Sequence, residues 1–162
     1  MGEKMNNAYN KDIKRSMDNR IIILDEDIRL ADIFGLDLKM RGYSTKAFDK
    51  GKDFINFYLK NPGNIVAVAD MDIPRNKGIN AILSIKEIAE YNGKNVETIG
   101  TTTYLTDLEK PRCINKLLVK PFYLEKLFEA VKESHERMKY PHYNVNKMLE
   151  ELSKPINKSY RI

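Results

Sequence analysis

Short apolar runs alternate with amphipathic stretches through the middle of the chain. The apolar runs are rich in β-branched residues and are bounded by polar turns, which is typical of strands. They predict strands at residues 21–24, 43–48, 65–69, 96–101 and 114–119. The stretches that follow four of the runs have apolar residues at helical spacing, which predicts helices. Their expected inward faces are Leu30, Ile33, Phe34 and Leu38; Phe54, Phe57 and Tyr58; Ile79, Ile82, Leu83 and Ile88; and Leu124, Leu127, Phe128 and Val131.

Turn residues separate these elements. Asp27 is suited to cap the first helix, and Gly42 and Asn92-Gly93 mark helix ends. Only a short helix is predicted at residues 105–110, because Pro111 follows. Alternating strands and helices predict an α/β domain over residues 20–139, a doubly wound parallel sheet with helices on both faces.

Two segments flank this domain. Residues 1–19 are polar and without apolar periodicity, so we predict a basic N-terminal arm. Residues 140–162 form a C-terminal extension with an amphipathic stripe, which predicts one extra short helix. The stripe consists of Val145, Met148, Leu149 and Leu152. Such a helix would dock on the domain or contact a partner, and a homodimer is one such contact.

Composition and charge narrow the class of protein. The 162 residues suffice for one ordinary domain with extensions. The net charge of +5 comes largely from the two ends, and nucleic-acid binding usually needs a denser basic face. The single cysteine, Cys113, cannot form an internal disulfide, and no run approaches the roughly 20 apolar residues of a membrane span. We therefore expect a cytoplasmic protein with no membrane contact.

Ionisable side chains follow three of the predicted strands. They are Asp25 and Glu26, Asp70, and Lys120. Parallel strands end at the same edge of a sheet, where ligands of α/β folds bind. Two carboxylates about 4 Å apart repel by roughly 4 kcal/mol at an effective dielectric near 20. The cluster therefore calls for a bound proton or a divalent cation, and oxygen ligands favour Mg²⁺ or Mn²⁺.

Each of these signals also has a plain structural interpretation. The acids at 25–27 would serve as helix caps, the threonines at 101–103 as strand residues, and Lys120-Pro121 as a loop. Their order, each after a different apolar run, favours one shared site instead. Aspartate, a divalent cation, a lysine and a threonine hydroxyl are together what phosphoryl transfer to a carboxylate requires.

At these residues the chain resembles the receiver domain of two-component response regulators, from about Asn19 to Arg137. The resemblance is carried by Ile-Ile-Leu-Asp25-Glu26-Asp27, by Val-Ala-Asp70-Met-Asp-Ile-Pro74 with Gly78, by the threonines at 101–103, and by Leu-Val-Lys120-Pro121-Phe122. It implies the CheY-like, flavodoxin-like strand order 2-1-3-4-5.

The resemblance also implies roles for individual residues. Asp70 matches the phosphoacceptor. Asp25 and Glu26 match the acidic pair that holds Mg²⁺ (or Mn²⁺) with Asp70 and the backbone carbonyl of Asp72. Thr102 matches the switch threonine, with Thr101 as the alternative one residue away. Lys120 matches the lysine that pairs with the phosphoryl group, and its bond to Pro121 is cis in the family.

Some positions depart from the family pattern. Glu26 replaces the more usual aspartate, Asp72 adds a carboxylate beside the acceptor, and Leu117 stands where an aromatic residue is common. The stretch between Thr102 and Lys120 is short, so the fourth helix is expected to be abbreviated.

The function expected from the resemblance is that of a single-domain response regulator rather than an enzyme. It would accept a phosphoryl group on Asp70 from a histidine kinase or phosphotransfer protein and signal by contact with an output protein. One alternative is a receiver-fold scaffold or dimerisation protein that works without phosphorylation. A remote alternative is a haloacid-dehalogenase-like phosphatase, because Asp70-Met-Asp72 resembles the nucleophile motif of those enzymes.

Overall fold

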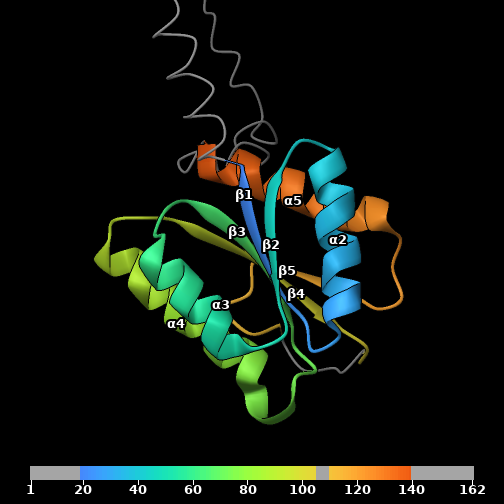
Figure 1. Cartoon of the computed structure of the whole chain (residues 1–162), viewed down its shortest axis with the longest axis horizontal. Helices are drawn as coiled ribbons and strands as arrows, with labels where there is room; N and C mark the ends of the chain where they lie inside the picture. The colour runs from blue at the N-terminus through green and yellow to red at the C-terminus, as the bar shows by residue number, and fades with distance from the viewer. Residues whose placement is uncertain (1–18, 105–109, 140–162) are drawn as a thin grey trace, which may run out of the picture.

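A five-stranded parallel sheet forms the centre of the computed structural model, which describes residues 19–104 and 110–139. The strands are β1 (Arg20–Leu24), β2 (Ser44–Phe48), β3 (Ile65–Asp70), β4 (Val96–Thr102) and β5 (Lys116–Val119). They lie in the order β2-β1-β3-β4-β5, and every pairing is parallel (Figure 1). The predicted fold class and strand order are confirmed.

Helices cover both faces of the sheet (Figure 1). They are α2 (Ile28–Met40), α3 (Gly51–Lys60), α4 (Lys77–Tyr91) and α5 (Leu124–Lys139), with a short 3₁₀ turn at Pro74–Asn76 before α4. Helices α3 and α4 bury Phe54, Tyr58 and Ile82 against one face of the sheet. Helices α2 and α5 bury Leu38 and Leu127 against the other. Each strand of the buried centre therefore contributes side chains to two separate cores, as a doubly wound sheet requires.

Two predicted core residues lie at the surface instead. Ile33 on α2 is 53% exposed and Leu83 on α4 is 44% exposed. Small residues occupy the buried faces in their place, Ala31 on α2 and Ala81 on α4. Prediction of the faces from large apolar residues alone was wrong at these positions, because a close helix-to-sheet contact favours small side chains.

Three predictions fall partly or wholly outside the described residues. They are the N-terminal arm at 1–19, the short helix at 105–110 that was expected as an abbreviated helix between the last two strands, and the amphipathic helix of the C-terminal extension at 140–162. Within the described ranges, no helix is long and apolar enough to cross a membrane.

The strand register brings the candidate site residues to one edge of the sheet. Leu24 of β1 pairs with Ala69 of β3, Asp70 pairs with Thr101 of β4, and Thr102 pairs with Val119 of β5. Asp25 and Lys120 follow directly after β1 and β5. Residues from four strands and their following loops thus meet at the carboxyl edge, as predicted for parallel strands.

Candidate functional site

Lys120 joins two buried carboxylates at the carboxyl edge of the sheet. Its ammonium nitrogen lies 2.9 Å from Oδ2 of Asp25 and 3.4 Å from Oδ2 of Asp70. The Asp25 side chain is 6% exposed and that of Asp70 is 11% exposed, so water screens these contacts poorly. The structure therefore brings together three of the residues predicted to form the site, one from each of three strand ends. The bond between Lys120 and Pro121 is cis, as the resemblance implied.

The pKa values of the cluster reflect burial and crowded charge. Burial raises the pKa of Asp70, and the neighbouring charges of Asp25 and Asp72 raise it further, against the lowering effects of the Asp72 N–H and Lys120. Burial alone would lower the pKa of Lys120, but the hydrogen bond and charge of Asp25, with the charge of Asp70, raise it overall. Asp70 is therefore an unusually basic carboxylate held next to a firmly charged lysine.

Backbone N–H groups fix the orientation of both carboxylates. The N–H of Asp27 donates to Oδ1 of Asp25, and the N–H of Asp72 donates to Oδ1 of Asp70, each at 3.0 Å. In both cases the donor lies two residues after the acid, which is the local turn that aspartate favours. Oδ2 of each acid is left facing Lys120.

Gly78 lets the loop after β3 fold back onto Asp70. A Cβ at position 78 would lie 2.0 Å from the backbone oxygen of Asp70, a distance that no side chain tolerates. The glycine is thus required by close packing under the acid, at the start of α4.

Asp72 faces the end of β4. Its Oδ1 accepts a hydrogen bond of 2.6 Å from the Thr102 hydroxyl. Its Oδ2 accepts bonds from the Thr103 N–H at 2.6 Å and from the Thr103 hydroxyl at 2.8 Å. Burial opposes ionisation of Asp72, but these hydrogen bonds outweigh it and lower its pKa.

The two threonine candidates are placed differently. The hydroxyl of Thr102 reaches Asp72, whereas Thr101 is 1% exposed within β4 at the register position of Asp70. Thr103 is a contact that the sequence analysis missed. The run of three threonines was its only signal, and strand alternation does not say which of them reaches across to the loop after β3.

The donor set suits a magnesium ion held by few protein ligands. Asp25 and Asp70 present carboxylate oxygens to Lys120 at the same edge, and the charge of Lys120 also acts on Asp72. Glu26 follows Asp25 in the sequence and is exposed. No three His, Cys, Asp or Glu side chains of the described ranges are grouped as a ready-made metal site. Mg²⁺ commonly uses one or two carboxylates and keeps several waters, so the two buried acids Asp25 and Asp70 fit such an ion.

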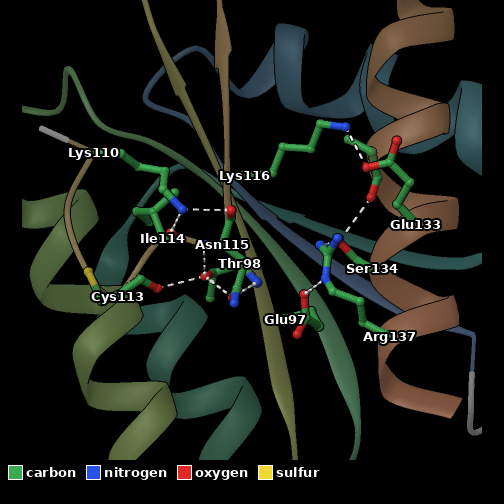
Figure 2. A network of polar contacts seen from close by, with 11 residues as sticks. Glu97, Thr98, Lys110, Cys113, Ile114, Asn115, Lys116, Glu133, Ser134 and Arg137 are labelled. Carbon is green, nitrogen blue, oxygen red and sulfur yellow. Dashed lines mark hydrogen bonds and ion pairs between the residues drawn. The ribbon is translucent and has the colours of Figure 1, made fainter. Parts of the chain in front are cut away.

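A second polar network positions β5 (Figure 2). The Thr98 hydroxyl on β4 lies 2.6 Å from the Cys113 carbonyl oxygen, and the Asn115 side chain accepts from the Thr98 N–H at 2.9 Å. The Lys110 ammonium donates to the carbonyls of Ile114 and Asn115, each at 2.7 Å. These contacts fix the chain just before β5, and β5 ends next to Lys120.

A hollow of about 290 Å³ lies at the opposite, amino edge of the sheet, with Arg41, Tyr43 and Phe128 among its lining residues. Arg41 is already paired with Asp37 and Glu125, and its guanidinium lies 4.3 Å from the centre of the Phe128 ring. The Arg41 charge beside the hollow is therefore already paired, whereas the buried contacts of Lys120 with Asp25 and Asp70 lie at the carboxyl edge.

Solved structures of response regulators and their receiver domains are similar to this chain. No protein-family model and no curated protein matches the sequence. A response regulator receiver domain of Clostridium thermocellum aligns with a TM-score of 0.65 at 19% identity, over 75% of this chain and 98% of that one. A CheY-like receiver domain protein of Methanospirillum hungatei aligns with a TM-score of 0.62 at 18% identity, over 76% and 98%. A response regulator of Thermotoga maritima in complex with Mg²⁺-BeF aligns with a TM-score of 0.59 at 21% identity, over 72% and 98%.

Proposed function

We propose that this chain, which has the fold of response regulator receiver domains, is a response regulator that accepts a phosphoryl group on Asp70. One observation carries the proposal. Asp70 ends the central strand β3, and its Oδ2 faces Lys120, which also binds Asp25. A basic carboxylate beside a fixed cation is arranged to attack phosphorus and to balance the charge that arrives.

The reaction is an exchange of one bond to phosphorus for another. An oxygen of the Asp70 carboxylate attacks the phosphorus of a phosphohistidine on a kinase or phosphotransfer protein. A P–O bond forms, the P–N bond breaks with its electron pair going to the imidazole, and that nitrogen then takes a proton. Burial raises the pKa of Asp70, which makes its carboxylate a better nucleophile than an exposed one.

Asp25, Glu26, Asp70 and the Asp72 carbonyl would hold a Mg²⁺ ion. The ion would supply positive charge for the phosphoryl oxygens. Lys120 would pair with a phosphoryl oxygen, for which it has to give up part of its contact with Asp25 or Asp70.

The acyl phosphate would alter the surface around the end of β4. A phosphoryl group adds about −1.5 to −2 charges, which attracts Lys120 and the hydroxyl of Thr102. Movement of Thr102 would carry the end of β4 with it, and an output protein would recognise the altered surface. Contact between proteins in the cytoplasm is also the output expected from the sequence.

Labelling with a small phosphodonor tests the proposal. The protein is incubated with acetyl phosphate or phosphoramidate, with and without Mg²⁺, and its intact mass is measured. Wild type should gain one phosphoryl group only with Mg²⁺, and Asp70→Asn should gain none. Asp32→Asn on α2 is a matched control, because Asp32 is an exposed acid outside the cluster, and it should label like wild type. Labelling of Asp70→Asn at the wild-type level would refute the assignment.

The same variants distinguish a scaffold that works without phosphorylation. For a response regulator, affinity for the output protein must change with phosphodonor in wild type and not in Asp70→Asn. Equal affinity in all four combinations would support the scaffold instead.

A further inference from the structure

Asp72 takes up three hydrogen-bond donors at the end of β4. Oδ1 binds the Thr102 hydroxyl, and Oδ2 binds the N–H and the hydroxyl of Thr103. Bonds to a charged acceptor are the stronger kind, and the two at 2.6 Å are short. The acid and the threonines are about thirty positions apart in the sequence, so this contact joins the loop after β3 to the end of β4.

The Thr102 hydroxyl has a single proton to donate. In the structure that proton is directed at Asp72 rather than at Asp70. A phosphoryl group on Asp70 would therefore compete with Asp72 for the same donor. Because Thr103 binds the other carboxylate oxygen, Thr102 can leave Asp72 while Thr103 stays bound.

We propose that Asp72 is a positioning residue that holds Thr102 away from Asp70 until a phosphoryl group outcompetes it. The inference rests on the proposed function, since it concerns the threonine that responds to phosphorylation of Asp70. Part of the phosphoryl group's attraction for Thr102 is then needed to break the hydrogen bond between Thr102 and Asp72, and only the remainder favours movement of the end of β4. An isolated receiver with this contact intact stays in the unphosphorylated arrangement more firmly than one without it.

The ligand-free protein provides the first readout. Thr103 is exposed, and its N–H is bonded to Asp72. In Asp72→Ala the exchange of this amide hydrogen should become about tenfold faster, as expected for loss of one charge-assisted hydrogen bond. The Met71 N–H, which donates to the Thr101 carbonyl at 2.8 Å, should keep its wild-type rate and serves as the internal control.

Binding of beryllofluoride with Mg²⁺, followed by amide NMR shifts, provides the second readout. Asp72→Ala should bind this phosphoryl analogue about tenfold more tightly than wild type, because no competing acceptor remains. Asp72→Asn should gain less, since its amide oxygen still accepts from Thr102 although the charge is gone. In a Thr102→Val background, Asp72→Ala should change the affinity by no more than about twofold. All these variants keep the backbone carbonyl of residue 72.

The outcomes separate the two proposals. Unchanged exchange of the Thr103 amide in Asp72→Ala would overturn the positioning role. So would an equal gain in Asp72→Asn, or a full gain in the Thr102→Val background, because either result would mean simple charge repulsion. Absence of beryllofluoride binding to wild type and to every variant would refute phosphorylation of Asp70 and the competition with it.

Discussion

Removing the Lys120 charge should destabilise the protein more than any loss of a surface ion pair. Lys120→Met keeps an unbranched side chain of similar length but leaves Asp25 and Asp70 without their shared cation. At an effective dielectric near 20, contacts of 2.9 and 3.4 Å each correspond to roughly 5 kcal/mol of attraction. Desolvation offsets much of this, and loss of one partner of a buried pair costs about 3 to 5 kcal/mol. Because the Lys120 side chain is 15% exposed, we expect the lower value, about 3 kcal/mol.

Urea unfolding at a series of pH values measures this cost. The difference between wild type and Lys120→Met should be largest near neutral pH and should shrink as pH falls, because protonated acids need no cation. Burial raises the pKa of Asp70, so the decline should begin above the usual range for aspartate. The two acids raise the pKa of Lys120, so its contribution persists at alkaline pH and is lost only as the pH rises through that raised value.

Lys116→Met is the matched control. Lys116 pairs with Glu133, whose side chain is 53% exposed, and such a pair contributes about 0 to 1 kcal/mol. A cost for Lys120→Met no greater than for Lys116→Met would refute the argument, as would a cost that stays constant down to acid pH.

Three further predictions concern the surroundings of the site. Asp70→Asn should raise the free energy of unfolding at neutral pH by about 1 kcal/mol. Because the pKa of Asp70 is raised in the folded protein, the free energy of unfolding of wild type should fall as the pH rises through that pKa. Urea titrations of Asp70→Asn should not show this fall. Gly78→Ala should lower the free energy of unfolding in urea by at least about 2 kcal/mol, because the added Cβ meets the Asp70 backbone. Gly93→Ala is the control: a Cβ there has open space, and the φ of 61° should cost about 1 kcal/mol. Thr98→Val should cost about 2 kcal/mol in the same assay by leaving the Cys113 carbonyl and the Asn115 N–H with fewer partners, and a loss under about 0.5 kcal/mol would contradict the positioning of β5 by this network.

The carboxyl-edge residues were predictable because the strands are short, apolar and parallel. Once 21–24, 65–69 and 114–119 were identified as strands, geometry required that Asp25, Asp70 and Lys120 lie at one edge. No further information about packing was needed. The fold class followed from the same alternation of strands and helices.

Contacts that depend on tertiary packing were less predictable. The burial of Ala31 and Ala81 in place of Ile33 and Leu83 reflects how closely the helices approach the sheet, which periodicity of large residues does not report. The hydrogen bond between Thr102 and Asp72 joins the end of β4 to the loop after β3, and the relative position of these two segments exists only in the folded protein.

The central claim is that Asp70 forms an acyl phosphate. Treatment with phosphoramidate and Mg²⁺, followed by borohydride reduction and peptide mapping, tests it at the level of a single residue. Borohydride converts an aspartyl phosphate to homoserine, so the account predicts homoserine at position 70 and at no other acid. Homoserine at another acid such as Asp25, or no reduction product in a protein that binds Mg²⁺, would contradict it.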